Sequence, residues 1–112
     1  SVCSSAPGKQ GHYPADAWNR ILAEQGSAAT ALLLDPDGQV GRAYGAKTTP
    51  HLFVVDAAGT LVYDGAIDDN PSTDSADIPG ARAYVAEALD AVLAGAPVPV
   101  AQTKPYGCSV KY

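Results

Sequence analysis

The chain has 112 residues, which is the size of one domain or of part of one. Its net charge is −5, and its seven Lys and Arg residues are scattered singly, so it lacks a basic stripe that could neutralise nucleic-acid phosphates. No apolar run approaches the about 20 residues needed to cross a bilayer, which argues against a membrane partner. Leu, Ile, Val and Phe are few, so we expect a thin, alanine-rich core, whereas six Tyr, one Trp and clear periodicity favour an ordered fold.

The sequence contains no methionine, although a newly translated chain normally begins with one. We therefore expect that a segment upstream of Ser1 has been removed. That segment is either a cleaved leader or part of the domain itself.

Periodicity and chain breakers predict four elements in the first half of the chain. Ser1–Ser5 has the pattern of a strand already under way, and a Pro/Gly loop follows it. Apolar residues at helical spacing after Pro14 predict a short amphipathic helix that stops at Gly26. The apolar run Thr30–Asp35, closed by Pro-Asp-Gly, predicts a buried strand. A second short helix is expected at Val40–Tyr44.

The second half of the chain predicts a hairpin, a helix and a tail. Two β-rich runs, His51–Asp56 and Thr60–Ile67, are joined by a short turn that contains glycine, a pattern typical of an antiparallel hairpin. The acidic stretch Asp68–Pro79 is expected to be a long surface loop. Apolar residues at three- and four-residue spacing over Ala81–Leu93 give the strongest helical signal of the chain. Residues 98–112 form a Pro-containing tail.

Several stretches of the sequence, taken in order and at their spacing, are similar to one known family. They are Ser4–Gly11, Asp35–Gly38, Gly41–Ala46, Thr48–Asp56 and Ile67–Asp69, and the tail Lys104–Lys111 looks like the ending of one bacterial branch. On these motifs the chain resembles the redoxin group of the thioredoxin-like superfamily. This group includes the peroxiredoxin-like relatives of alkyl hydroperoxide reductase and thiol-specific antioxidant proteins, and the resemblance covers nearly the whole chain.

The resemblance implies an α/β thioredoxin-like fold with three α/β/α layers. Residues 1–97 would form the domain and residues 98–112 a tail that carries Cys108. The chain lacks the N-terminal strand-helix unit in which the family carries its first catalytic cysteine. In the family the missing strand lies between the strands represented here by Ser1–Ser5 and His51–Asp56, so both would keep unpaired backbone groups. We expect a second copy, a rearranged tail or a separate N-terminal segment to pair these edges.

The family reads Thr49-Pro50 as a cis-proline loop that faces the reactive cysteine. A trans proline at the start of a strand is the alternative, because X-Pro bonds in general are cis in only about 5% of cases. By resemblance, the backbone of Thr49 is exposed to pair with a peptide or thiol substrate. The role expected of Thr49 and Pro50 is substrate binding rather than bond making.

Cys108 is a candidate catalytic residue. It lies near Lys104 and Lys111 in the sequence, and positive neighbours favour the thiolate that attacks disulfides and sulfenic acids. By resemblance it is a resolving thiol on a mobile tail. The alternative is an inert, exposed thiol in a loose end.

Cys3 is expected to pack in the core, since free cysteine is a common small core residue. A disulfide with Cys108 is a second possibility, and a catalytic role is a third. Two cysteines do not decide the redox compartment. Arg42 is a weaker candidate, as a cation near the site, but a solvent-facing helix charge is the simpler interpretation.

Neither a metal nor a cofactor is indicated. The loop acids lack the spacing of a calcium-binding hand; they are Asp68, Asp69, Asp74 and Asp77. His12 and His51 are too few and too far apart to form a zinc site with the cysteines. These acids are therefore expected to form a solvated loop.

Two functions remain open from the sequence. The first is a thiol-disulfide oxidoreductase or thiol peroxidase-like antioxidant redoxin, which this chain, without the first cysteine, would not sustain alone. Its substrates would be a thiol or disulfide protein or a peroxide. The second is a non-catalytic thioredoxin-fold module that binds partners through the Thr49-Pro50 loop and exposed strand edges. A cytoplasmic location is slightly favoured.

Overall fold

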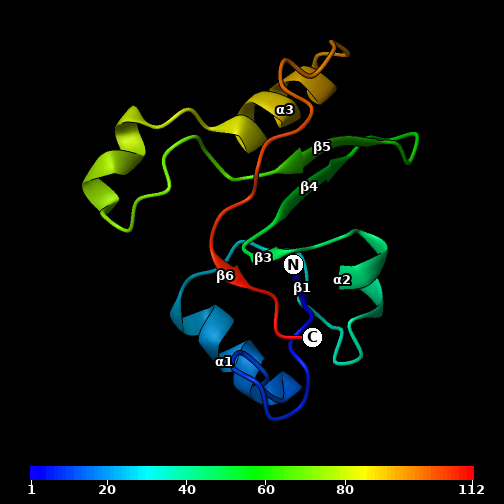
Figure 1. Cartoon of the computed structure of the whole chain (residues 1–112), viewed down its shortest axis with the longest axis vertical. Coiled ribbons are helices and arrows are strands. Elements are labelled where there is room, and N and C mark those ends of the chain that lie inside the picture. The colour runs from blue at the N-terminus through cyan, green and yellow to red at the C-terminus, as the bar shows by residue number, and fades with distance from the viewer. The chain divides into compact units, whose positions relative to one another are not determined.

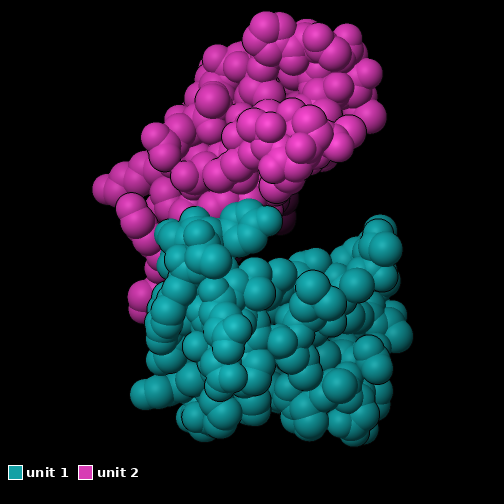
Figure 2. Space-filling view, turned by 90° about the vertical axis from the view of Figure 1, so that its right-hand side faces the viewer, with its two compact units in different colours: residues 1–46, 110–112 teal, residues 47–109 magenta.

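The computed structural model describes residues 1–112, and the chain divides into two compact units. Unit 1 contains residues 1–46 and 110–112, and unit 2 contains residues 47–109 (Figure 2). The last three residues of the tail therefore belong to the unit that is built mainly from the first part of the chain.

Unit 1 begins with a strand and a helix, both as predicted. Strand β1 (Val2–Cys3) pairs in parallel with β2 (Leu33–Leu34), and helix α1 spans Ala15–Glu24 (Figure 1). Pro14 precedes the first turn of α1, where a missing N–H costs nothing. A strand forms within Thr30–Asp35, as predicted. The prediction that this strand is buried is wrong, because Leu33 and Leu34 are 58% and 44% exposed.

The predicted second short helix is α2 (Gln39–Ala43), and the Asp35 carboxylate fixes its first turn. Its two oxygens accept the backbone N–H groups of Val40 and Gly41 at 3.1 and 2.9 Å, and one also accepts the Ser4 hydroxyl at 2.7 Å. Burial alone would raise the pKa of Asp35, but the hydrogen bonds from Gly41, Ser4 and Val40 outweigh it and lower that pKa. Asp35 is therefore a structural carboxylate that holds the start of a helix.

Unit 2 contains the predicted hairpin, formed by β4 (Leu52–Val55) and β5 (Leu61–Gly65). The two strands are antiparallel, with Phe53 opposite Asp64. The turn between them is closed by the Asp56 carboxylate, which accepts the N–H groups of Ala58 and Thr60, both at 2.9 Å. The sequence prediction of the hairpin is confirmed.

A second antiparallel pair in unit 2 joins distant parts of the chain. Strand β3 (Thr48–Thr49) pairs with β6 (Cys108–Ser109) near the end of the tail. Each of the three sheets, β1-β2, β3-β6 and β4-β5, has two strands.

Two helical segments follow the hairpin. A 3-10 helix, η1 (Ser75–Gly80), lies within the stretch that was expected to be a loop only, and the Asp74 side chain accepts the N–H of Ala76 at its start. Helix α3 spans Tyr84–Leu93, as predicted except for its first residues. It begins late because the Asp69 carboxylate binds the Arg82 N–H at 2.8 Å, outside the helix.

The buried apolar core is thin and rich in alanine, which confirms that prediction. Its members are Val54, Tyr63, Ala66 and Ala88. All four lie in unit 2, where α3 packs against β4 and β5, and unit 1 has no fully buried apolar side chain. None of the helices combines the length and the apolar character needed to cross a membrane.

Candidate functional site

The site expected at Thr49-Pro50 is occupied by the chain's own tail. Thr49 lies opposite Cys108 in the β3-β6 pair, and Thr48 lies opposite Ser109. The Thr49-Pro50 peptide bond is cis, as predicted. The backbone of Thr49 is not left open for a substrate, as the sequence had suggested, because the tail strand pairs with it.

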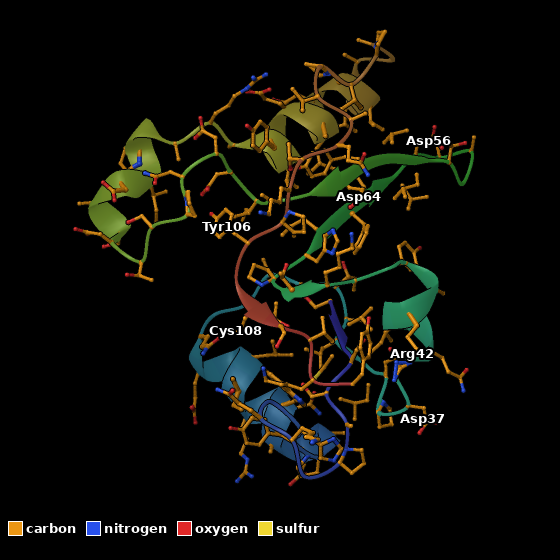
Figure 3. All side chains as sticks on the ribbon, viewed as in Figure 1. Asp37, Arg42, Asp56, Asp64, Tyr106 and Cys108 are labelled. Carbon is orange, nitrogen blue, oxygen red and sulfur yellow. The ribbon has the colours of Figure 1, made fainter.

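Cys108 is an exposed free thiol on this strand (Figure 3). The tail that carries it is not a loose end. Ala101 O accepts the Asp64 N–H at 3.1 Å, and Asp64 O accepts the Thr103 N–H at 3.0 Å, so the tail follows the edge of β5 before it reaches β3. The structure therefore brings together three of the predicted site residues, Thr49, Pro50 and Cys108.

Gly107 makes this approach possible. A Cβ atom at this position would lie 2.3 Å from the Thr49 carbonyl oxygen and 3.3 Å from Pro50 Cδ. Real Cβ atoms do not approach backbone oxygens so closely, and the φ angle of +136° is one that residues with side chains rarely adopt. Only glycine fits between the tail and the Thr49-Pro50 bond.

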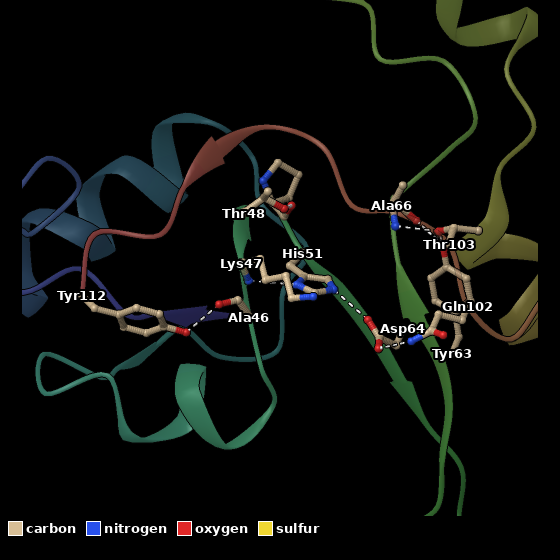
Figure 4. A network of polar contacts seen from close by, with 11 residues as sticks. Ala46, Lys47, Thr48, His51, Tyr63, Asp64, Ala66, Gln102, Thr103 and Tyr112 are labelled. Atoms are coloured by element: carbon tan, nitrogen blue, oxygen red, sulfur yellow. Dashed lines mark hydrogen bonds and ion pairs between the residues drawn. The ribbon is translucent and has the colours of Figure 1, made fainter.

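His51 follows Pro50 and forms a network that no motif of the sequence indicated (Figure 4). Its Nδ1 accepts the Lys47 backbone N–H at 3.2 Å, so Nε2 carries the proton and donates to Asp64 Oδ1 at 2.7 Å. Gln102 Nε2 donates to the other Asp64 oxygen at 3.1 Å. The side chain of His51 is 5% exposed, and its ring lies 4.4 Å from that of Phe53. The network fixes the first residue after the cis bond.

A second network ties the tail to the core. The buried Tyr63 hydroxyl donates to Ala66 O at 2.5 Å, so the Thr103 hydroxyl donates to Tyr63 Oη at 2.7 Å. The Thr103 oxygen in turn accepts the Ala66 N–H at 2.9 Å. Burial raises the pKa of Tyr63. Thr103 had no recognisable signal in the sequence, because its partners lie 37 and 40 residues away.

Tyr106 also anchors the tail within unit 2. Its hydroxyl donates to the Asp68 carboxylate and lies 3.2 Å from Asn70 O. The hydrogen bond to Asp68, together with burial, raises the pKa of Tyr106 to about 12. Tyr106 is two residues before Cys108, so this contact holds the strand just ahead of the thiol.

Cys3 belongs to unit 1 and is a half-buried free thiol. Its Sγ donates to Gly11 O at 3.3 Å, and the thiol is only partly buried, so it does not lie in a buried apolar core as expected. Because Cys3 and Cys108 are both free, the disulfide considered from the sequence is not formed. Arg42, the other weak candidate, lies over the Tyr112 ring at 4.2 Å within unit 1.

The acids of the 68–79 stretch bind the backbone around them. Asp68 accepts the N–H of Asn70 at 3.0 Å, and Asp69 and Asp74 close the turns described above. His12 Nδ1 lies 3.2 Å from Ser5 O. No group of three or more His, Cys, Asp or Glu side chains gathers in a way that could hold a metal ion.

Comparison with known proteins gives matches among solved structures. The chain is similar to a hypothetical protein from Sinorhizobium meliloti 1021, with a TM-score of 0.83 and 30% identity, over 99% of this chain and 59% of that one. An uncharacterised conserved protein from Geobacillus kaustophilus matches with a TM-score of 0.79 and 28% identity, over 99% of this chain and 57% of that one. The chain thus spans less than two thirds of their length.

No protein-family model matches the chain. No curated protein matches it either. The descriptions of the two similar structures give no activity, so the function is inferred from the site.

Proposed function

We propose that this chain is the C-terminal part of a thiol-disulfide oxidoreductase of the redoxin, peroxiredoxin-like kind, with a thioredoxin-like fold. Cys108 is its resolving thiol, and Thr49 with Pro50 forms a substrate platform that is accessible only when strand β6 leaves β3. The observation that carries the proposal is the pairing of Cys108 with Thr49, directly before the cis bond. An exposed thiol is thereby held at the loop at which the family's reactive cysteine would meet its substrate.

The reaction proceeds by thiolate attack on oxidised sulfur. A hydroperoxide first oxidises a cysteine outside this chain to a sulfenic acid, and the peroxide is reduced to an alcohol or water. The Cys108 thiolate attacks that sulfur, an S–S bond forms, and hydroxide leaves and is protonated to water. An external dithiol then reduces the disulfide by two exchange steps and is itself oxidised.

This chain alone sustains no such cycle, because it holds one exposed thiol and lacks the peroxide-reacting partner. A cytoplasmic location is part of the proposal.

The first experiment measures the reactivity of each thiol with dithio-bis-nitrobenzoate. The variants Cys3→Ser and Cys108→Ser each leave one thiol, and a peptide with the sequence of residues 106–110 is the unstructured reference. We expect Cys108 to react at least about tenfold faster than Cys3, because Cys3 is half-buried and bonded to Gly11 O. Cys108 should also react faster than the peptide. A rate equal to that of the peptide would exclude a tuned resolving thiol.

A non-catalytic binding module is the second candidate. It is favoured by the distribution of the cysteines, which lie in different units and form no Cys-x-x-Cys pair. The two candidates predict different full-length proteins. The enzyme requires a cysteine at the first strand-helix junction, and the binding module does not. The intact mass and sequence of the protein purified from its source, measured without reductant, decide between them.

A further inference from the structure

His51 lies at the corner between β3 and β4, and both nitrogens of its ring are hydrogen-bonded (Figure 4). Nδ1 accepts the Lys47 N–H at 3.2 Å, and Nε2 donates to Asp64 Oδ1 at 2.7 Å. The side chain is 5% exposed, so water has little access to the ring. All three residues belong to unit 2. His51 is therefore a buried titratable group that the proposed reaction does not use.

The two partners of the ring make opposite demands on its protonation. A ring nitrogen that accepts a hydrogen bond carries no proton, so the contact with the Lys47 N–H requires the neutral imidazole. The Asp64 carboxylate favours the imidazolium instead, because the opposite charge stabilises it. A proton added at Nδ1 would face the Lys47 N–H, and two donors repel each other. Protonation of His51 therefore breaks the contact with Lys47 and converts the contact with Asp64 into an ion pair.

The groups that face the ring come from both strands of the hairpin and from the segments on either side of it. Strand β5 contributes Asp64, whose other carboxylate oxygen accepts from the Gln102 side chain of the tail at 3.1 Å. Strand β4 contributes the Phe53 ring at 4.4 Å. Lys47 contacts the ring through its backbone N–H, and the residue is exposed. Asp64 thus supplies the charge next to the ring, and the backbone of Lys47 opposes it.

The contact with Lys47 also restrains β3. Lys47 directly precedes Thr48 and Thr49, the two residues of β3 that pair with β6. So short a strand forms few ladder hydrogen bonds, and two-stranded pairs are only marginally stable by themselves. A hydrogen bond at the residue before the strand therefore matters for its position. When that bond is lost, β3 should separate from β6 in a larger fraction of molecules.

We propose that His51 is a pH-sensitive lock on β3. The neutral ring holds Lys47 and keeps β3 against β6, and the imidazolium releases Lys47 and opens the backbone of Thr49. The inference rests on the proposed function in that this backbone belongs to its substrate platform, so the lock regulates the same site. Histidine ordinarily changes charge between about pH 5 and 8, which is the range in which the lock is to be tested.

The test measures amide hydrogen exchange of the wild-type chain by NMR between pH 8 and pH 5. Each rate is divided by that of an unstructured chain at the same pH, and the nitrogen shifts of the His51 ring record its protonation in the same samples. We expect the protection of Lys47 and of the β3-β6 pair, residues 48–49 and 108–109, to fall at least about tenfold as the ring becomes charged. The β4-β5 hairpin should keep its protection, which excludes general acid unfolding.

Three results of this experiment would overturn the lock. The first is a ring that stays neutral at pH 5. The second is a charged ring with unchanged protection at Lys47. The third is loss of protection at Lys47 alone, with the β3-β6 pair unchanged, because the contact would then not control the strand.

Asp64→Asn tests the direction of the effect. The variant removes the carboxylate that favours the imidazolium, so the opening of β3 should move to lower pH. His12→Gln is the matched control, because His12 is the other histidine of the chain, is exposed and belongs to unit 1. Its opening should occur at the same pH as in the wild type. An opening that is unchanged in Asp64→Asn, or that disappears in His12→Gln, would contradict the assignment to His51.

His51→Asn tests the role of the acceptor. Asparagine offers an acceptor oxygen near the place of Nδ1 and takes up no proton, so the protection of β3 should not fall between pH 8 and pH 5. A fall of the same size as in the wild type would show that another group titrates. Because the wild-type measurement needs no substitution, the proposal stays testable if this variant does not fold.

The outcome is separable from that of the proposed function. Hydrogen exchange involves no thiol chemistry, and Cys108→Ser should show the same pH-dependent opening as the wild type. Opening of β3 together with an unreactive Cys108 would refute the oxidoreductase and retain the lock. A reactive Cys108 on a strand pair whose protection does not depend on pH would refute the lock and retain the oxidoreductase.

Discussion

Tyr106 in unit 2 is a titratable group with a strongly raised pKa. Its hydroxyl donates to the Asp68 carboxylate, which raises its pKa to about 12 from an ordinary value of 10.0. The folded state therefore favours the protonated phenol. The contribution of this hydrogen bond to the stability of the folded state is fully present below pH 10. It is lost as the pH rises toward 12, because the phenolate repels Asp68 and no longer donates a hydrogen bond.

We predict that the absorbance titration of tyrosinate in the wild-type chain ends with a step near pH 12 that is missing in Tyr106→Phe. The alkaline loss of thermal stability between pH 10 and 12 should be smaller in the variant. Tyr63 also has a raised pKa, so only the difference between the two proteins identifies Tyr106. Identical titration curves would show that the contact with Asp68 does not persist in solution.

The single residues that the sequence predicted correctly are those with a local signal. Thr49 and Pro50 were recognised through the resemblance of Thr48–Asp56 to the redoxin family, together with their position directly before a β-rich run, and the cis bond is confirmed. His51 was considered only as a metal ligand. Its contact with Asp64 depends on the register of the β4-β5 hairpin, which no local pattern of the sequence specifies.

At the scale of elements, Thr103 connects the tail to strand β5. We predict that Thr103→Val lowers the free energy of unfolding by about 1–3 kcal/mol, because the buried Ala66 N–H loses its acceptor and Tyr63 Oη loses a donor. Valine has nearly the same shape as threonine, so the change removes the hydroxyl and little packing. Urea unfolding followed by circular dichroism measures the effect.

Thr60→Val is the matched control for this prediction. Thr60 is exposed in the hairpin turn, and its contact with Asp56 is made through the backbone N–H. The control should change the free energy of unfolding by less than about 0.5 kcal/mol. If Thr60→Val lowers the free energy of unfolding as much as Thr103→Val does, the hydrogen bonds of Thr103 contribute no specific stability.

Elements with strong periodicity or clear breakers were predicted well, as α1, α2, α3 and the hairpin show. Strand β6 was not foreseen, because two residues in a Pro-containing tail carry no periodicity and their partner lies about 60 residues earlier. Strand β2 was expected to be buried from its leucines, but burial depends on what covers a strand, and Leu33 remains 58% exposed. Helix η1 was not predicted, because its N-cap residue, Asp74, lies among several other acidic residues, and this stretch was expected to be a solvated loop.

At the scale of the whole molecule, the two units differ in what stabilises them. Unit 2 holds all four buried apolar residues, whereas the buried residues of unit 1 are Asp35 and glycines. Burial of apolar surface is the main favourable term in folding. We therefore predict that α1 loses hydrogen-exchange protection at lower urea concentration than β4, β5 and α3 do.

One substitution in each unit tests this difference. Val54→Ala removes buried methyl groups from unit 2 and should lower its unfolding midpoint, by about 1–3 kcal/mol in free energy, while α1 is unaffected. Leu33→Ala removes a side chain that is 58% exposed and should change either unit only slightly. Loss of protection in both units at one urea concentration, in the wild type and in Val54→Ala alike, would mean that the chain unfolds as one cooperative body.

Trp18 is an intrinsic fluorescence probe of unit 1. It is the only tryptophan, it lies in unit 1 edge-on to Tyr13 at 5.5 Å, and its buried indole N–H has no hydrogen-bond partner. Intrinsic indole emission therefore registers events around α1. A ligand that shifts the wavelength of this emission therefore changes the surroundings of Trp18 in unit 1.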